Sequence, residues 1–347
     1  MSRKNATIKD IANLAGVSIG SVDRAIHGRY GIKVETRKKI LNIIEQSGYE
    51  VNELASSLSR RNHIRIAFVT TQAYFDEFYC DVQRGALAAA EQLKDYGIEV
   101  IPCFLADFDK EAEKRTLEEL LSRNIQGIIL CPFHENELDE VIDKFTDMGV
   151  PVVTVATDAP KSKRLACVST DSRKNGEMAA ELMSLLIGGE GKVIAISGFK
   201  SITDHEQKLQ GFCSYLSQYA PRIEIVGAFH TCQNETEIYN ITSSMLETHT
   251  DLKGIYIATS SSKGACKAVE DYNRGDSIKF ISTDLHKEVR AYMQKGIIDA
   301  SIYQSPYRQG FLSAQILFDY IAKGKLTAGT NFIRPEIVLP GCVALFN

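Results

Sequence analysis

Residue patterns that would perform covalent or metal chemistry are few in this sequence. The GGEGKV stretch at 188–193 looks like a phosphate loop, but it lacks the first glycine at the required spacing and has Val193 where Ser or Thr would hold Mg²⁺. No GxGxxG follows a candidate strand, and no HExxH occurs. Eight cysteines are spread along the chain without a CxxC pair, which argues against zinc sites and disulfide frameworks. We therefore expect no catalytic residue, no metal and no cofactor.

Charged side chains, in contrast, are unevenly placed. The 347-residue chain has a formal net charge of −4, with 40 Lys and Arg against 44 Asp and Glu. Residues 1–65 hold twelve of the basic and six of the acidic side chains, which leaves 28 basic and 38 acidic for the rest. A small basic head on a larger acidic body suggests a nucleic-acid-binding module fused to a second unit, although a merely solvated basic surface is the alternative.

Three short helices are predicted in this basic head. Thr7 is a candidate N-cap for a first helix that would end at Gly16, where glycine accepts left-handed backbone angles. Ser18 can cap a second helix that starts about one residue later, and a third fits 34–46. Two helices joined by a short glycine-containing turn form the helix-turn-helix pattern, whose second helix enters the major groove of DNA.

The head also resembles a known family. The stretch TIKDIANLAGVSIGSVDRAIHG, followed by TRKKI and GYEVNELASSL, is similar over residues 6–61 to the N-terminus of the lactose-repressor (LacI/GalR) family. The resemblance implies a DNA-binding domain at 1–51 and a hinge helix at 52–61, which pairs with that of a second subunit on operator DNA. Three departures are Val51 in place of the usual Pro, Lys33 in place of a capping Ser, and Gly20, which removes a side chain from the base-reading face. The operator sequence is therefore not transferable from relatives.

The resemblance assigns roles to individual positions of the head. Arg24 would bond a guanine edge, and Leu58 would wedge into the minor groove and bend the duplex. Ile19 and Gly20 fall where the family varies its base-reading side chains. Ser18, Ser21, His27 and Thr36 fall at positions that usually meet phosphates, which orient the protein without specifying sequence. The expected DNA-binding residues are Thr7, Ser18, Ile19, Gly20, Ser21, Arg24, His27, Thr36, Asn52, Ala55 and Leu58.

Residues 62–347 alternate between strand-like and helix-like segments. Apolar, β-rich runs occur at 64–70, 98–104, 127–133 and 151–157, with helical patterns at 85–97, 111–124 and 137–149 between them. A second series of strands starts near Gly191 and covers 192–198, 224–230, 254–260, 279–284 and 299–305. Such alternation predicts an α/β body of two doubly wound parallel sheets, with a cleft where the carboxyl ends of their strands face each other.

This body resembles a type I periplasmic sugar-binding fold, and PVVTVATDAPKSKR at 151–164 is similar to ribose-type sugar-binding proteins. The resemblance implies an effector-binding and dimerisation domain at 62–347. Its N-lobe would hold about 62–169 and 306–325, its C-lobe about 170–303, and residues 326–347 would pass between the lobes. The three crossings are expected near 168–171, 303–306 and 322–330.

The same resemblance points to seven cleft residues. Phe78 and Tyr79 would flank a sugar ring, because the C–H face of a sugar lies well on a π-face. Asp284 and Gln304 would bond sugar hydroxyls, and Lys208 replaces an expected Arg, which disfavours a carboxylate or phosphate ligand. Core packing, capping and inter-lobe hydrogen bonds are the alternatives for these residues. The expected ligand-binding residues are Phe78, Tyr79, Asp158, Lys208, Thr259, Asp284 and Gln304.

The sequence thus predicts a ligand-responsive transcription factor, most simply a repressor that senses a sugar and binds a pseudo-palindromic operator as a dimer. No apolar run is long enough to span a membrane, and the start MSRKNATIKD lacks an apolar signal region, so we expect a cytoplasmic protein. A solute-binding protein for uptake and an α/β enzyme are the competing classes. The basic head and the missing signal argue against the first, and the lack of a catalytic constellation argues against the second.

Overall fold

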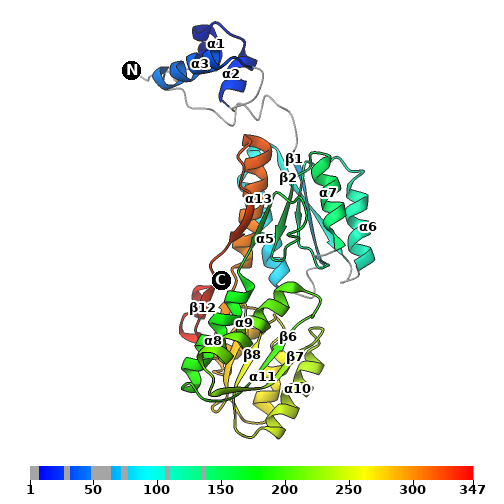
Figure 1. Cartoon of the computed structure of the whole chain (residues 1–347), viewed down its shortest axis with the longest axis vertical. Coiled ribbons are helices and arrows are strands. Elements are labelled where there is room, and N and C mark those ends of the chain that lie inside the picture. The colour runs from blue at the N-terminus through cyan, green and yellow to red at the C-terminus, as the bar shows by residue number, and fades with distance from the viewer. Residues whose placement is uncertain are drawn as a thin grey trace.

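The computed structural model describes residues 8–26, 32–47, 64–71, 77–105, 110–134 and 137–346. Figure 1 shows a small helical head at the blue end of the chain and an elongated body of two α/β lobes. The head comprises α1 (Ile8–Ala15), α2 (Ile19–Ile26) and α3 (Val34–Ser47). The three helices of the head follow the sequence prediction, and the α/β body has the predicted fold class.

The head is held together by a small apolar core. Ile11, Val22 and Ile40, one from each helix, are fully buried. Gly16 ends α1 with a φ of +67°, which glycine adopts without steric cost. Ser18 caps α2, because its Oγ accepts a hydrogen bond from the Ser21 backbone N–H at 3.2 Å. The expected cap of α1, Thr7, lies outside the described residues.

The N-lobe is built on a six-stranded sheet in the order β11-β5-β4-β3-β1-β2, with all neighbours parallel. In Figure 1, α5 and α13 lie on one side of this sheet, and α6 and α7 lie on the other. Its elements are β1 (Ile64–Thr71), α5 (Glu77–Gln92), β2 (Ile98–Leu105), α6 (Lys110–Leu120), β3 (Gly127–Leu130), α7 (Asp139–Asp147), β4 (Val152–Val155), β5 (Ala166–Ser169), α13 (Pro306–Lys323) and β11 (Gly329–Phe332).

The C-lobe repeats this plan with a six-stranded sheet in the order β12-β10-β9-β8-β6-β7. Its neighbours are parallel except β12, which runs antiparallel to β10. Its elements are α8 (Ser172–Ile187), β6 (Gly191–Ser197), α9 (Thr203–Tyr219), β7 (Ile223–His230), α10 (Glu235–Thr248), β8 (Leu252–Ile257), α11 (Lys263–Asp271), β9 (Lys279–Thr283), α12 (Lys287–Gln294), β10 (Ala300–Tyr303) and β12 (Glu336–Val338).

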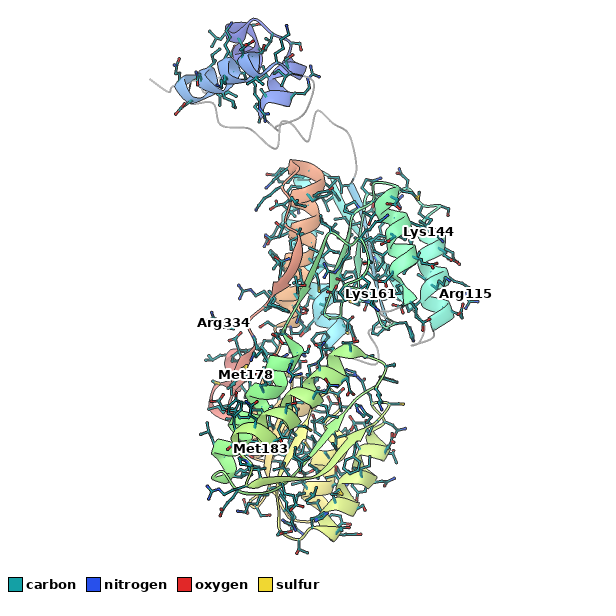
Figure 2. The ribbon with its side chains drawn as sticks, in the orientation of Figure 1. Arg115, Lys144, Lys161, Met178, Met183 and Arg334 are labelled. Carbon is teal, nitrogen blue, oxygen red and sulfur yellow. The ribbon has the colours of Figure 1, made fainter. Side chains whose placement is uncertain are left out.

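The chain passes between the lobes three times. It leaves the N-lobe between β5 and α8, returns between β10 and α13, and leaves again between β11 and β12. The prediction of a third crossing near 322–330 was wrong, because β11 still pairs with β5 of the N-lobe and the crossing follows at 333–335. Arg334, labelled in Figure 2, marks this crossing and is exposed.

In each lobe, two helices beside the cleft pack with their backbones in close contact, α5 with α13 in the N-lobe and α8 with α9 in the C-lobe. A Cβ on Gly85 of α5 would lie 1.9 Å from the Tyr307 carbonyl oxygen of α13, and one on Gly310 would lie 1.8 Å from that of Val82. In the C-lobe, a Cβ on Gly176 of α8 would lie 2.0 Å from the Lys208 carbonyl oxygen of α9. These backbones approach so closely that only glycine fits, and the pairs therefore set the positions of the α5 and α9 N-termini.

Some elements of the body differ from the sequence prediction. The helix predicted at 85–97 begins at Glu77 instead, so Phe78 and Tyr79 lie in its first turn. The short strands β5, β11 and β12 and the helix α8 were not predicted. Within the described ranges, no helix combines the length and the apolar character needed to cross a bilayer.

Candidate functional site: an exposed helix of the head and an inter-lobe cleft

Five of the predicted DNA-binding residues lie on α2 or immediately before it. Val22 and Ala25 of this helix are buried against the head core, whereas Ser18, Ile19 and Gly20 are exposed. The Arg24 side chain extends toward the N-terminus of α2, where its Nη2 donates a hydrogen bond to Ser21 Oγ at 3.4 Å. The Arg24 guanidinium lies beside Gly20, where a Cβ would be 3.8 Å from Nη1, an ordinary van der Waals distance.

Of the other predicted DNA-binding residues, only Thr36 lies within the described ranges. Thr36 is partly exposed in the first turn of α3. Buried Arg24 Nε has no hydrogen-bond partner within the described part of the chain. The other predicted DNA-binding residues lie outside the described residues, namely Thr7, His27, Asn52, Ala55 and Leu58.

The cleft between the lobes contains a cavity, hereafter the inner cavity, whose empty volume of about 420 Å³ includes space open to solvent. Loops after β4, β8, β9 and β10 reach it together with the first turns of α5 and α9, as expected for the carboxyl edges of two facing sheets. Six of the seven predicted ligand residues line it. The lining is Phe78, Tyr79, Ala156, Thr157, Ile202, Asp204, His205, Lys208, Gln233, Thr259, Ser260, Thr283, Asp284 and Gln304.

Asp284 is fixed at the end of β9 and is 3% exposed. Its Oδ1 accepts the Gln304 backbone N–H at 2.9 Å, and its Oδ2 accepts Gln304 Nε2 at 2.7 Å. Burial raises the pKa of the Asp284 carboxyl, although His286, Lys208 and the bonds from Gln304 oppose this. Each carboxylate oxygen can accept a further bond, so Asp284 remains able to bind a hydroxyl in the cavity.

Gln304 connects this carboxylate to another crossing between the lobes. Its Oε1 accepts hydrogen bonds from Thr170 Oγ1 at 3.0 Å and from Asn175 Nδ2 at 3.1 Å. Thr170 follows β5 in the first crossing, whereas Gln304 follows β10 in the second. The amide predicted to bind a ligand is thus also part of a buried network that joins two crossings.

Lys208 and Asp204 form a buried ion pair one turn apart on α9. Lys208 is 2% exposed, and its Nζ lies 2.5 Å from Asp204 Oδ2. Ser172 Oγ donates to the other carboxylate oxygen. Burial would raise the pKa of Asp204, but the charge of Lys208, the nearby His205 and these hydrogen bonds outweigh it and lower the pKa. The Lys208 charge is therefore already neutralised within the protein.

Two buried polar atoms of the cavity lining are unsatisfied. His205 Nδ1 and Thr259 Oγ1 have no hydrogen-bond partner in the described part of the chain. Burial, with the Lys208 charge, lowers the pKa of His205 to about 4, so its ring is neutral near pH 7. Because a buried polar group without a partner costs free energy, these atoms are suited to a polar ligand.

An aromatic wall closes the N-lobe side of the inner cavity. Phe78 and Tyr79 are 8% and 7% exposed, with ring centroids 5.2 Å apart in an edge-to-face arrangement. Phe133, after β3, packs edge-to-face on Tyr79 at 5.2 Å. These rings belong to the N-lobe core and also line the cavity, so the core-packing and ligand-facing interpretations both apply.

Asp158 does not line the inner cavity. Arg164 Nη2 donates to its Oδ2 at 2.5 Å, Arg164 Nε bonds its Oδ1, and Thr154 Oγ1 donates to Oδ1 at 2.8 Å. Asp158 instead lines a neighbouring cavity beside β5 and β11. Asp204 and His205, on the other hand, line the inner cavity without having been predicted, because nothing in the TDH sequence at 203–205 marks the start of a cleft helix.

The two lobes also touch directly at the cleft. The Lys287 backbone N–H, at the start of α12, donates to Glu77 Oε2 of α5 at 2.9 Å. His286 Nδ1 lies 3.8 Å from the same oxygen. No group of three or more His, Cys, Asp or Glu side chains in the described ranges is placed to hold a metal ion.

Comparison with known proteins assigns the family. A periplasmic binding protein domain model matches residues 66–326, and a model of bacterial regulatory proteins of the lacI family matches residues 7–52. The chain belongs to the LacI family of transcriptional regulators. The body of this LacI-family regulator has the two-lobed type I periplasmic-binding-protein fold, as predicted.

Relatives of this regulator include a catabolite control protein, an operon repressor and sugar-binding proteins. Catabolite control protein A of Staphylococcus epidermidis is 26% identical over 96% of each chain. The ribose operon repressor of Halalkalibacterium halodurans is 25% identical over 76% of this chain and 74% of its own. Among solved structures, GanP, a glucose-galactose binding protein from Geobacillus stearothermophilus, matches with a TM-score of 0.73 and 26% identity, covering 81% of this chain and 99% of its own.

Proposed function

We propose that this regulator represses carbohydrate-utilisation genes by binding a pseudo-palindromic operator as a homodimer and that it responds to a sugar in the inner cavity. It would act in the cytoplasm, where operator DNA is accessible. We propose residues 1–51 as the DNA-binding domain, 52–61 as the hinge helix and 62–347 as the effector-binding and dimerisation domain.

The chemistry of the inner cavity is the observation on which the sugar assignment rests. His205 Nδ1 and Thr259 Oγ1 are unsatisfied polar atoms, and the Asp284 carboxylate retains acceptor capacity. Phe78 and Tyr79 border the same space with aromatic surface. A sugar ring supplies hydroxyls for the polar atoms and C–H faces for the rings, so a single ligand class matches both.

Operator recognition would use the exposed side of α2. Arg24, beside the bare backbone of Gly20, is suited to bidentate bonding of guanine O6 and N7. The named relatives in Staphylococcus and Halalkalibacterium support a repressor, since a control protein and an operon repressor are among them.

Coupling between the sugar and the operator would proceed through the arrangement of the lobes. The Glu77–Lys287 contact and the Thr170–Gln304 bond belong to the lobe arrangement described above. A ligand that bonds groups of both lobes favours this arrangement over a more open one by its difference in affinity for the two. The population of DNA-competent dimers would change accordingly.

The test combines two measurements on the full chain. Selection from a random DNA pool identifies the operator, and its affinity should fall steeply with salt, because Lys and Arg groups displace condensed counterions. A thermal-shift screen against sugars should find a ligand that raises the melting temperature and alters operator affinity. A salt-independent affinity, or a sugar that stabilises the protein without any effect on DNA binding, contradicts the proposal.

A further inference from the structure

A second cavity, hereafter the side cavity, adjoins the inner cavity. It has about 740 Å³ of empty volume and shares three lining residues, Ala156, Thr157 and Asp204, with the inner cavity. The two cavities are therefore adjacent parts of one inter-lobe space. The lining of the side cavity is Ala156, Thr157, Asp158, Pro160, Ser169, Thr170, Asp171, Ser172, Thr203, Asp204, Gln207, Thr330 and Phe332.

The side cavity presents mainly hydroxyl and carboxylate groups. Six of its lining residues are Ser or Thr, and Gln207 adds an amide. Several hydroxyls already make one bond but have capacity left. Thr330 Oγ1, for example, accepts from Arg164 Nη2 at 3.4 Å and still has its own proton to donate. This lining suits a ligand that both donates and accepts hydrogen bonds, as sugar hydroxyls do.

An exposed aromatic ring stands at the edge of this polar lining. Phe332 is the last residue of β11, the edge strand of the N-lobe sheet, and is 61% exposed. Its neighbour Ile333 is 5% exposed, so the chain buries the next apolar side chain and leaves this ring in solvent. A ring of this kind beside hydroxyls provides a stacking surface for the C–H face of a sugar.

The charge of the side cavity restricts what can occupy it. Asp158, Asp171 and Asp204 line it, and among the residues that the structure describes no Lys, Arg or His does. Arg164 is paired with Asp158, and Lys208 is paired with Asp204. A carboxylate or phosphate placed here would meet the like charge of these aspartates, so an uncharged group is favoured.

We propose that the effector is an uncharged sugar of at least two rings, with one ring in the inner cavity and the next in the side cavity against Phe332. This inference rests on the proposed sugar-sensing function and names the class of sugar. Asp204 and Thr157, common to both cavities, would contact the ligand near the glycosidic linkage. A monosaccharide would fill the inner cavity alone.

The experiment measures dissociation constants by calorimetry on the full-length protein. The probes are glucose, galactose, ribose and arabinose, the disaccharides maltose, cellobiose, lactose and sucrose, and aldobiouronic acids that have a carboxylate on the second ring. We expect at least one uncharged disaccharide to bind about tenfold or more tightly than its component monosaccharides, a difference of about 1.4 kcal/mol. Aldobiouronic acids should bind more weakly than their uncharged counterparts.

Phe332→Ala locates the second ring. This variant should weaken disaccharide binding roughly fivefold, in the range that aromatic contacts contribute, and leave monosaccharide binding unchanged. Phe104→Ala is the matched control, because Phe104 is 45% exposed on β2, the opposite edge of the same sheet. It should change neither affinity.

The possible outcomes distinguish a failure of the two-ring inference from a failure of the proposed sugar-sensing function. Monosaccharides that bind as tightly as every disaccharide overturn the two-ring inference but leave sugar sensing intact. A tight disaccharide whose affinity does not respond to Phe332→Ala, or that loses equally in Phe104→Ala, overturns the placement in the side cavity. If no sugar in the panel binds, both the inference and the proposed function are overturned.

Discussion

Gln304 donates two hydrogen bonds to Asp284, one from its backbone N–H at 2.9 Å and one from its side-chain amide at 2.7 Å. The side-chain carbonyl oxygen of Gln304, Oε1, accepts a hydrogen bond from the Thr170 hydroxyl, which lies on another crossing between the lobes. A ligand hydroxyl that bonds Asp284 would therefore act on a group that already determines the geometry between the lobes. Ligand affinity and lobe geometry then depend on one carboxylate, and a change there should affect both.

Asp284→Ala should weaken sugar binding at least about tenfold and also lower the melting temperature. The ligand loses a charge-assisted acceptor, and two Gln304 donors are left without a partner, at about 1–3 kcal/mol for each unsatisfied group. Calorimetry and thermal unfolding with the identified sugar check both effects. Asp276→Ala, at an exposed C-lobe position, is the control and should change neither. An unchanged dissociation constant for Asp284→Ala would remove the basis of the cleft assignment.

Protonation of His205 should make the protein less stable in mild acid. Burial lowers its pKa in the folded state to about 4 from 6.5, so the unfolded chain binds the proton first as the pH falls. The free energy of unfolding should therefore decrease between pH 6.5 and 4, by about 3 kcal/mol from this group. Denaturant unfolding at several pH values, compared with His205→Gln, isolates the effect from other titrating groups. Parallel pH profiles for the two proteins would contradict it.

Arg24→Ala should cost about 1–3 kcal/mol of binding free energy at the cognate base pair and flatten the base preference there. The reason is that a bidentate guanidinium reads one base edge, whereas phosphate contacts weaken binding to all sequences alike. Gel shifts with operators substituted at each position measure the preference. Arg115→Ala, on α6 of the N-lobe as labelled in Figure 2, removes the same charge far along the chain and should leave DNA affinity intact. A uniform loss across all operators for Arg24→Ala would indicate a phosphate contact instead.

Gly310→Ala should destabilise the body strongly. The added Cβ would lie 1.8 Å from the Val82 carbonyl oxygen, so α5 and α13 must separate, at a cost of about 3 kcal/mol or more for overpacking against backbone. Thermal unfolding measures this cost. Gly341→Ala makes the same chemical change where nothing lies within 4 Å, and it should leave the melting temperature close to wild type. Equal melting temperatures for both variants would show that the helix pair tolerates separation.

The sequence predicted correctly those parts of the fold that depend on a local pattern of apolar residues. The head helices and the buried parallel strands have strong apolar periodicity, so their positions could be predicted. The strands β11 and β12 could not, because GTNF and EIV are short and mostly exposed, and only pairing with β5 and β10 makes them strands. The third crossing was misplaced for the same reason.

The residues of the candidate site also differ in whether the sequence could predict them. Asp284 and Gln304 were expected in the cleft from the resemblance to sugar-binding folds, and both line the inner cavity because they follow strands whose carboxyl ends face the cleft. His205 Nδ1 is unsatisfied because the fold buries the ring against Gly198, where a Cβ would lie 2.6 Å from Nδ1. This burial depends on tertiary packing, so no residue spacing in the sequence could predict it. Asp158, expected from the resemblance to contact the ligand, is paired with Arg164, six residues later, and lines the side cavity instead of the inner one.

The three crossings between the lobes also constrain how such a protein can change over evolutionary time. Neither lobe is encoded by one uninterrupted stretch, because β11 and β12 of the last segment complete different sheets. Exchange of the C-lobe with a relative would require three recombination junctions, each in a segment that must still fit both lobes. The head, by contrast, precedes the whole body in sequence, and a single junction suffices to exchange it. A head and a whole body can therefore be recombined as units by gene fusion, whereas one lobe alone cannot be exchanged without matching all three crossings.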